Sequence, residues 1–463
     1  MLYKIKSISG IRGTIGGQVG ENLTPIDAVK FASAYGVWIK QQREKENYKV
    51  VVGRDARISG KMMQNLVMNT LIGLGIDVVD LGLSTTPTVE VAVPMEHADG
   101  GIILTASHNP KQWNALKLLN SDGEFLDGDE GAKILEIAES DTMNFADVDS
   151  LGKITKNRAY IDLHIIEVLD LPLVTVTSIE EARFKVVVDG VNSTGGIAIP
   201  LLLERLGVDV IKLYCEPNGH FPHNPEPLKE HLTDLSEEVK KHKADFGIVV
   251  DPDVDRLAFM DENGDMFGEE YTLVACADYV LSRTPGNTVS NMSSTRALRD
   301  VTEKHGGTYE ASAVGEVNVV KLMKKNKVVI GGEGNGGIIY PDAHYGRDAL
   351  VGVALFLSLL ADKRMTVSEL RKTYPNYFMS KKKIQLTPDL DVDGILRSIE
   401  ARYKNEQLTT IDGVKIDFPE SWVHLRKSNT EPIIRIYTEA KSQEEADTLA
   451  DKFIEEIGAI AKI

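Results

Sequence analysis

Short apolar runs alternate with amphipathic stretches along most of this chain. The runs are rich in Val, Ile and Leu, and glycine or polar residues follow each of them, which predicts buried strands. They lie at 49–53, 76–82, 100–104, 185–189 and 246–250. Helices are expected over 24–42, 61–74 and 159–169, and an apolar stripe of Val29, Phe31, Ala32 and Tyr35 marks the first. This alternation of strands and helices predicts α/β domains with mixed, mostly parallel sheets.

One strand pattern recurs three times. Runs of Lys-Val-Val followed by Val or Ile begin at Lys49, Lys185 and Lys327, which are 136 and 142 residues apart. Self-similarity at a nearly constant interval indicates repeated units, so we expect three similar α/β domains. After residue 373 the pattern changes to alternating strands around turns, with a closing helix over 443–457. It predicts an α+β domain with an antiparallel sheet. We place the four domains at 1–153, 154–257, 258–373 and 374–463.

Composition narrows the class of protein. The formal net charge of -17 over 463 residues argues against a nucleic-acid binder, because phosphate backbones attract basic surfaces. Cys215 and Cys276 are the only cysteines, and they lack metal spacing, which favours free thiols in a reducing compartment. The sequence starts without a signal-peptide pattern and has no apolar run of membrane-spanning length. We therefore expect a cytoplasmic protein, a monomer or a homodimer, with neither a nucleic-acid nor a membrane partner.

The strand at 100–104 runs into a small polar turn with the sequence Thr-Ala-Ser-His-Asn-Pro. The Asn-Pro pair ends regular structure, so Ser107 and His108 are expected at the carboxyl end of a strand, where open α/β sheets bind ligands. A simple turn or capping role for Ser107 is the alternative. Lys117 follows ten residues later, and taken alone it has the pattern of a surface lysine.

Three aspartates follow the strand at 246–250. Asp251, Asp253 and Asp255 would repel one another unless a cation joins them, and oxygen ligands at this density suit Mg²⁺. A calcium loop requires glycine at its sixth position, where this chain has Arg256. A strand ending in Asp-x-Asp-x-Val also begins haloacid-dehalogenase-type phosphatases, in which the first aspartate is the nucleophile. That motif should open its catalytic domain, whereas here it lies in mid-chain.

Two later loops carry candidate ligand-binding residues. Glu333 and Asn335 lie among five glycines, where a ligand can approach the backbone closely. The turn after residue 425 combines cationic and hydroxyl donors suited to a dianionic phosphate, which arginine can bind through two oxygens. Its candidate residues are Arg426, Ser428, Asn429, Thr430 and Arg435. An exposed basic turn is the alternative reading of this stretch.

Four motifs, TASHNP, DPDVDR, GEGNGG and RKSNTEP, occur in this order and resemble those of the α-D-phosphohexomutases. This family contains phosphoglucomutases, phosphomannomutases and phosphoglucosamine mutases. The resemblance covers essentially the whole chain. It implies four domains around a central cleft and an enzyme that interconverts hexose 6-phosphate and hexose 1-phosphate.

The resemblance also implies roles for the motif residues. Ser107 would carry the phosphoryl group, with a hexose 1,6-bisphosphate as intermediate and activator. Mg²⁺ would be held by Ser107 and the three aspartates, and Arg12, Lys117 and Arg256 would supply positive charge. His108 or Lys117 would transfer the proton. Glu333 would bind sugar hydroxyls, and the loop from Arg426 to Arg435 would bind the phosphate that is not transferred. These roles require the Ser107 oxygen to be accessible and within a few ångströms of the three carboxylates.

The sugar loop departs from the family pattern Glu-x-Ser-Gly-His. Asn335 replaces the serine and Gly337 the histidine, so a possible acid/base group is missing, and His344 is one hypothesis for its replacement. The loop looks most like that of archaeal-type phosphoglucosamine mutases. Glucosamine 6-phosphate is therefore the leading substrate, with mannose and glucose phosphates as alternatives. A haloacid-dehalogenase-like aspartyl-phosphate phosphatase and a non-catalytic sugar-phosphate-binding regulator are the hypotheses from other classes.

Overall fold

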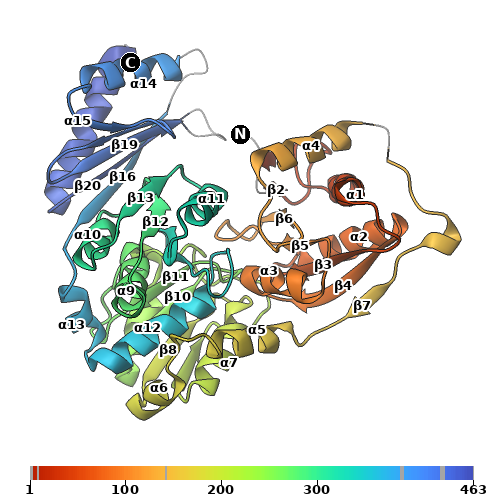
Figure 1. Cartoon of the computed structure of the whole chain (residues 1–463), viewed down its shortest axis with the longest axis horizontal. Helices are drawn as coiled ribbons and strands as arrows, with labels where there is room; N and C mark the ends of the chain where they lie inside the picture. Colours follow the sequence, from red (N-terminus) through yellow and green to blue (C-terminus); the bar gives the residue numbers. More distant parts are fainter. Residues whose placement is uncertain (1–3, 8–9, 141–142, 386–390, 428–432, 462–463) are drawn as a thin grey trace.

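The computed structural model describes residues 4–7, 10–140, 143–385, 391–427 and 433–461. Four domains follow one another along the chain, with the first at one side and the fourth at the opposite end (Figure 1). The first three have mixed sheets covered by helices, and the fourth has an antiparallel sheet. This confirms the predicted fold class.

Domain 1 contains a seven-stranded sheet with the order β1-β2-β6-β5-β3-β4-β7. Strands β5, β3, β4 and β7 are parallel, while β1, β2 and β6 complete an antiparallel edge. The strands are β1 (Lys4–Ser7), β2 (Gly10–Thr14), β3 (Tyr48–Arg54), β4 (Ile76–Leu83), β5 (Gly100–Leu104), β6 (Trp113–Leu119) and β7 (Ile154–Lys156). The helices are α1 (Pro25–Gln42), α2 (Gly60–Gly73), α3 (Thr86–Met95) and α4 (Gly128–Glu139), with a short 3-10 helix at Val148–Ser150.

Helix α1 begins where the sequence predicts it. Thr24 caps its first turn and Asp27 returns the bond to the Thr24 backbone, so two otherwise unpaired amides are satisfied. Phe31, Ala32 and Tyr35 are fully buried, as the stripe predicts. The prediction was wrong for Val29, which is 37% exposed, because that position is rotated off the face that these three residues share.

Domains 2 and 3 repeat one topology. Their sheets have the orders β11-β10-β8-β9 and β13-β12-β14-β15, which are the same arrangement read in opposite directions. The strands are β8 (Lys185–Asp189), β9 (Asp209–Leu213), β10 (Phe246–Val250), β11 (Leu257–Met260), β12 (Thr288–Asn291), β13 (Tyr309–Ser312), β14 (Ile330–Glu333) and β15 (Gly337–Ile339). The helices are α5 (Tyr160–Leu169), α6 (Val176–Ala182), α7 (Gly195–Arg205), α8 (Thr233–His242), α9 (Glu269–Arg283), α10 (Ala297–Lys304), α11 (Glu316–Asn326), α12 (Ala349–Lys363) and α13 (Val367–Lys372), with a 3-10 helix at Lys229–His231.

This topology corrects one member of the predicted repeat. Strands β3 and β8 occupy equivalent central positions, but their counterpart in domain 3 is β12, not the strand predicted from Lys327. Lys327 instead ends helix α11 in a left-handed conformation at φ 49°, and β14 begins only at Ile330. β14 is the equivalent of β5 and β10, and each of these three strands turns into an antiparallel neighbour. The turns after β5, β10 and β14 carry the serine, aspartate and glycine-rich motifs respectively.

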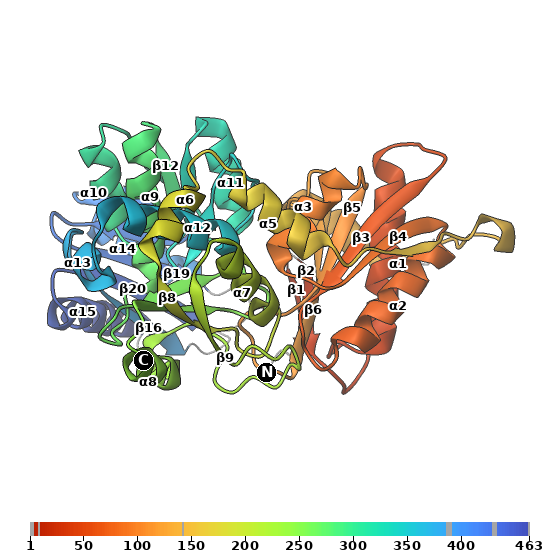
Figure 2. The ribbon, with the colours of Figure 1, turned by 90° about the horizontal axis from the view of Figure 1, so that it is seen from below.

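Domains 2 and 3 share one continuous hydrophobic core. Helix α12 is apolar on every side and lies between the two sheets, where Phe356 stacks on Phe259 of β11 with ring centroids 3.7 Å apart. Domain 1 and domain 4 have cores of their own. The two middle domains therefore form one packing unit, which lies between the two outer ones in Figure 1 and beside domain 1 in the view of Figure 2.

Domain 4 is built on the antiparallel order β16-β20-β19-β18-β17. Its strands are β16 (Phe378–Gln385), β17 (Gln407–Thr409), β18 (Val414–Asp417), β19 (Trp422–Lys427) and β20 (Ile433–Ala440), and its helices are α14 (Val392–Arg402) and α15 (Gln443–Ala461). Among the described residues, no helix has the length and apolar character needed to cross a membrane.

Two expected domain boundaries divide sheets. β7 lies beyond 153 but pairs with β4 of domain 1, and β11 begins at 257 but pairs with β10 of domain 2. We therefore propose boundaries near residues 157 and 267 and keep the one near 373.

Candidate active site

The Ser107 turn connects β5 to β6. Ser107 has a left-handed backbone at φ 48°, and its Oγ donates a hydrogen bond to Asp251 Oδ2 at 2.6 Å. His108 Nδ1 lies 3.3 Å from the same Oγ. The turn of domain 1 and the aspartate turn of domain 2 are thus in direct contact, as the sequence requires for a shared site.

Arg57 holds the serine turn in place. Its guanidinium donates to the carbonyl oxygens of Asn109, Pro110 and Trp113 at 2.7–2.9 Å, and also to that of Ser107. Asp55 fixes the other side of this guanidinium through Arg57 Nε at 2.9 Å, and it accepts a bond from Thr105. The Arg57 side chain is fully buried. Sequence reasoning missed Arg57, because spacing alone did not reveal that 57 and 107 would meet.

The three aspartates lie together, fully buried, in the turn between β10 and β11. One oxygen from each of them falls within 4.8 Å of the others. Asp253 Oδ1 and Asp255 Oδ1 are buried and have no hydrogen-bond partner among the described residues. Because buried carboxylate oxygens are normally satisfied, this turn fits a hard divalent cation such as Mg²⁺.

Burial and mutual repulsion shape the electrostatics of this turn. Burial, together with the neighbouring carboxylates of Asp255 and Asp253, raises the pKa of Asp251 well above its usual range. Burial also acts to raise the pKa of Asp255, but Arg347, Lys117 and Arg256 outweigh it, so this pKa is lowered. A cation bound at this turn would favour the ionised form of Asp251.

The predicted cations surround the two turns. Lys117 Nζ on β6 lies 2.7 Å from Asp253 Oδ2 and 3.3 Å from Asp255 Oδ2. Arg12 on β2 donates to the side-chain oxygen of Asn109 at 2.7 Å. Arg256 pairs with Glu226 at 3.2 Å, and its buried Nε has no hydrogen-bond partner within the described ranges. The structure therefore brings all three cations to the serine and aspartate turns.

The two candidates for proton transfer differ in charge state. Burial alone would lower the pKa of Lys117, but Asp253 and Asp255 outweigh it and raise this pKa, so the amine stays protonated. Burial, Arg256 and Arg12 lower the pKa of His108 well below its usual value, so the imidazole stays neutral.

Arg347 is a further cation that sequence reasoning missed. Its guanidinium contacts Asp255 Oδ2 at 2.8 Å, Glu316 Oε2 at 3.0 Å and Glu333 Oε2 at 3.0 Å. It therefore links the aspartate turn of domain 2 to the glycine-rich turn of domain 3. No motif marked Arg347, since a lone arginine after a glycine carries no signal in the sequence.

The glycine-rich turn places Glu333 in the interior, at 5% exposure. Glu333 Oε1 accepts from Asn291 Nδ2 at 2.8 Å, and Asn335 Nδ2 lies 3.4 Å from Glu333 Oε2. The turn also touches the aspartate motif, because the carbonyl of Gly336 accepts from the amide of Leu257 at 3.0 Å. The proposed sugar-binding residues thus lie directly beside the aspartate turn.

The predicted phosphate loop is described only in part. Ser428, Asn429 and Thr430 lie outside the described residues, while Arg426 and Arg435 face each other across β19 and β20. Lys383 of β16 is directly opposite Arg435 on its other side, so three cations form a row across the sheet. Like charges directly opposite one another are destabilising; Asp412 pairs with Arg426 at 3.2 Å, and a bound anion would relieve the remaining repulsion.

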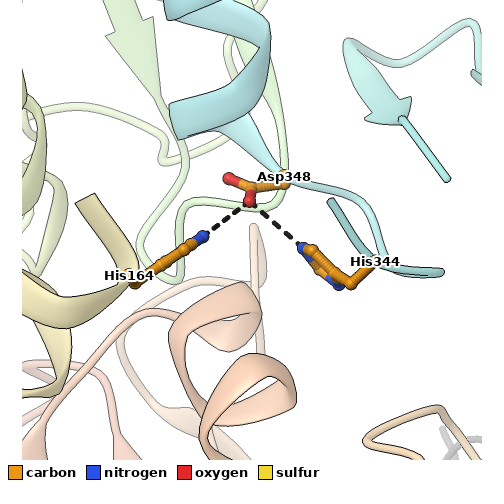
Figure 3. Close-up of side chains that lie close together, drawn as sticks. All are labelled: His164, His344 and Asp348. Carbon is orange, nitrogen blue, oxygen red and sulfur yellow. Dashed lines mark hydrogen bonds and ion pairs between the residues drawn. The ribbon is translucent and has the colours of Figure 1, made fainter. Parts of the chain in front are cut away.

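Two expectations about individual side chains do not hold in this structure. Ser107 is only 3% exposed, so the requirement that its oxygen be accessible is not met, although its distance from the carboxylates is as expected. A reaction at this oxygen therefore requires the serine turn and the aspartate turn to move apart. His344 Nε2 lies 3.1 Å from Asp348 Oδ2 (Figure 3), and its Nδ1 lies 3.5 Å from Glu90 Oε2; neither partner belongs to the serine, aspartate or glycine-rich turn. Its geometry does not support the hypothesis that it replaces a sugar-loop histidine.

Comparison with known proteins covers all four domains. Family models described as phosphoglucomutase/phosphomannomutase match in chain order: alpha/beta/alpha domains I, II and III at 4–145, 160–264 and 268–377, and the C-terminal domain at 383–456.

Individual relatives match over nearly their whole length. A phosphoglucomutase/phosphomannomutase of Thermococcus kodakarensis is 37% identical over 438 residues, covering 94% of this chain and 95% of the relative. A probable phosphoglucosamine mutase of Methanopyrus kandleri is 33% identical and covers 96% of both chains. The crystal structure of a phosphoglucomutase/phosphomannomutase family protein from Burkholderia thailandensis superposes with a TM-score of 0.85 at 26% identity, covering 98% of this chain and 97% of that one.

Proposed function

The chain belongs to the phosphoglucomutase/phosphomannomutase family and is an enzyme of the phosphohexomutase kind, and we propose that it works through a phosphoserine at Ser107. It would interconvert hexose 6-phosphate and hexose 1-phosphate through a hexose 1,6-bisphosphate. The observation that carries this proposal is the 2.6 Å contact between Ser107 Oγ and Asp251 Oδ2, at the meeting point of the serine and aspartate turns.

We propose that Asp251, Asp253 and Asp255, together with an oxygen at Ser107, hold Mg²⁺. The unpartnered Oδ1 atoms of Asp253 and Asp255 supply the donors for it. When bound, the ion would neutralise charge on the transferring phosphoryl group.

The chain's own residues would position and balance the transfer. A sugar hydroxyl attacks the phosphorus of phosphoserine 107, the bond from phosphorus to Oγ breaks, and the hydroxyl proton passes to a base. Return of the other phosphoryl group from the bisphosphate to Oγ restores the phosphoserine. Arg12, Lys117 and Arg256 surround this path with positive charge. His108 is neutral and adjacent to Oγ, and Lys117 is the alternative proton carrier.

We propose glucosamine 6-phosphate and glucosamine 1-phosphate as the preferred pair. The Glu-Gly-Asn-Gly-Gly sugar turn supports this choice, and so does the probable phosphoglucosamine mutase of Methanopyrus kandleri. Glucose and mannose phosphates are the alternatives, supported by the Thermococcus kodakarensis relative. Rates on glucosamine, glucose and mannose 1-phosphates, measured with Mg²⁺ and the matching bisphosphate, decide between them. Preference for either neutral sugar would overturn the amino-sugar assignment.

Ser107→Ala tests the mechanism. The variant should keep sugar-phosphate affinity but lose turnover by at least about 10⁴-fold, because the group that carries the phosphoryl is removed. Substrate binding by calorimetry and turnover of the hexose phosphates are the two measurements. Undiminished turnover would contradict the proposal.

Chemical lability of the labelled enzyme identifies the phosphorylated residue. Protein labelled from a hexose bisphosphate should keep its phosphate in hydroxylamine, since a serine phosphate resists hydroxylamine and an acyl phosphate does not. Loss of the label, together with its absence from Asp251→Asn, would instead assign the nucleophile to Asp251.

A further inference from the structure

A second cluster of metal-ligand side chains lies outside the proposed active site. His164 of α5 and His344 direct their Nε2 atoms at the same oxygen of Asp348, at 2.8 and 3.1 Å (Figure 3). His164 and Asp348 are 1% exposed, and the His344 side chain is 14% exposed. We propose that His164 Nε2, His344 Nε2 and Asp348 Oδ2 form a binding site for Zn²⁺.

The distances suit this coordination. Ligand atoms of the three residues fall within 4.8 Å of one another. In a tetrahedral zinc site with bonds of about 2.0–2.1 Å, neighbouring ligand atoms lie roughly 3.3 Å apart. The contacts of 2.8 and 3.1 Å therefore need to open by only a few tenths of an ångström. Two imidazoles and one carboxylate leave a fourth position for water.

The outer contacts hold both imidazoles in the orientation that a metal requires. A ligating histidine normally donates its second ring N–H to an oxygen, which fixes the tautomer. His164 Nδ1 lies 3.0 Å from Thr88 Oγ1, which in turn bonds Thr85 Oγ1 at 2.7 Å. His344 Nδ1 lies 3.5 Å from the carboxylate oxygen Oε2 of Glu90. Asp348 uses its other oxygen to cap α12 through the amides of Leu350 and Val351, which leaves Oδ2 for the metal.

Glu90 is a second buried carboxylate beside the cluster. Its side chain is buried, and neither carboxylate oxygen has a hydrogen-bond partner in the part of the chain that is described. A divalent ion behind the His344 ring would balance the charges of Asp348 and Glu90 together, since burying unpaired carboxylates is unfavourable.

The ligands distinguish this site from the aspartate turn. Carboxylate oxygens alone suit Mg²⁺, whereas a set with two imidazoles suits Zn²⁺. The new site also joins domains, because Glu90 comes from domain 1, His164 from the helix that opens domain 2, and Asp348 from domain 3. Helix α5 contacts both α3 and α12. Bound zinc would therefore stabilise the junction of three domains.

The metal content of the tag-free protein tests the proposal. After dialysis against Zn²⁺ in excess Mg²⁺, the full chain should retain about one zinc per molecule. Its Tm should rise on addition of Zn²⁺ and fall again with a chelator, because a ligand that binds only the folded state stabilises it. Co²⁺ in place of zinc should give the intense visible bands of a four-coordinate site. Zinc content near zero with no shift in Tm would overturn the proposal and leave a hydrogen-bonded cluster.

Variants assign the ion to these residues. His344→Gln, at the least buried ligand, should lose more than 10-fold in zinc affinity and lose the cobalt bands while remaining folded by circular dichroism. Asp251→Asn, in the aspartate turn, should keep both. His242→Gln is the matched control, because this histidine lies on α8 away from the cluster and is partly exposed. Zinc retained by His344→Gln but lost from Asp251→Asn would place the ion in the aspartate turn and refute the second site.

Discussion

Individual residues of the serine turn owe their positions to a partner distant in the sequence. The left-handed φ of Ser107 is unfavourable for a residue with a side chain, and the buried Arg57 offsets this cost by bonding four carbonyl oxygens around it. The chemistry at Oγ therefore depends on a guanidinium that need not touch the substrate.

Arg57→Lys tests this dependence. Lysine keeps the positive charge beside Asp55 but cannot donate to four carbonyls at once. We expect kcat to fall by about 10²-fold through misplacement of Ser107. The free energy of unfolding should fall by about 2–4 kcal/mol if about two of the four carbonyls lose their donor, at roughly 1–2 kcal/mol for each.

The neighbouring Arg54→Lys is the control, because Arg54 is half-buried and bonds Gln64 and the Asp55 carbonyl but not the serine turn. Steady-state rates and denaturant unfolding of both variants are the measurements. Equal losses in the two would contradict a specific role for Arg57.

His424 links domain 4 to domain 3 and should make stability depend on pH. Its Nδ1 lies 2.8 Å from Ser293 Oγ, and burial, aided by Lys415 and Arg426, lowers the pKa of His424 to about 4. The unfolded chain, with a histidine pKa near 6.5, binds more protons between these values. Stability should therefore fall as the pH drops from about 6.5 to 4, by at most about 1.4 kcal/mol per unit.

His424→Gln should lower Tm at pH 7. Between pH 7 and pH 5, the Tm of this variant should fall less steeply than that of the unaltered protein. Thermal unfolding across this pH range measures the effect, with the partly exposed His242→Gln as the reference. An unchanged slope would show that His424 does not contribute to it.

At the residue scale the sequence predicted Ser107 and the three aspartates, because their motifs are local. Arg57 and Arg347 were missed for the opposite reason. Arg57 donates hydrogen bonds to carbonyl groups, and Arg347 to carboxylates, that are distant from them in the sequence. A single sequence does not show which distant residues will be in contact.

Among the elements, the turn from β14 to β15 imposes the strictest geometry. Gly336 has φ 86°, and a Cβ there would lie 2.1 Å from the Leu257 carbonyl oxygen beside the aspartate turn. Gly336→Ala should therefore lower stability by about 3 kcal/mol or more, through backbone strain and a backbone clash. Turnover should fall with it, because the displaced strand carries the metal-binding turn.

Gly306→Ala separates the effect of backbone strain from that of the backbone clash. Gly306 has a similar φ of 78°, but its Cβ would meet nothing within 4 Å, so only strain of about 1–2 kcal/mol is expected. Comparison of the two Tm values is the measurement. Equal shifts would remove the clash from the explanation.

Elements were predicted well where periodicity was long and poorly where it was short. The apolar stripe correctly predicts helix α1, whereas the run that begins at Lys327 predicts a strand although Lys327 itself ends a helix. An apolar run of three residues, Val328 to Ile330, fits either structure, and only the topology of the sheet decides between them.

At the scale of the whole molecule, the shared core makes domains 2 and 3 inseparable. A fragment of residues 157–377 should fold and unfold cooperatively, since it keeps Phe259 against Phe356 and the rest of the common core. Residues 157–267 alone should be unfolded or aggregated, because the sheet face that α12 covers would be exposed. Circular dichroism and calorimetry of the two fragments test this, and independent folding of the shorter one would refute it.

The number and class of domains followed from the sequence, but their association did not. A pattern of apolar and polar residues shows that one face of an element is buried, but it does not show which domain that face packs against. Nothing in the apolar run of α12 indicated that its two sides face two different sheets.

The row of Lys383, Arg435 and Arg426 across domain 4 has a kinetic consequence for a molecule of net charge -17. The net negative charge of the molecule repels a diffusing sugar phosphate, while this row attracts it locally, so its capture would be guided by a local field. Added salt screens both effects, with a Debye length of about 8 Å at 0.15 M. The attraction acts on the final approach and the repulsion over the larger distance, so ionic strength would alter encounter rates while leaving the bond-breaking step unchanged.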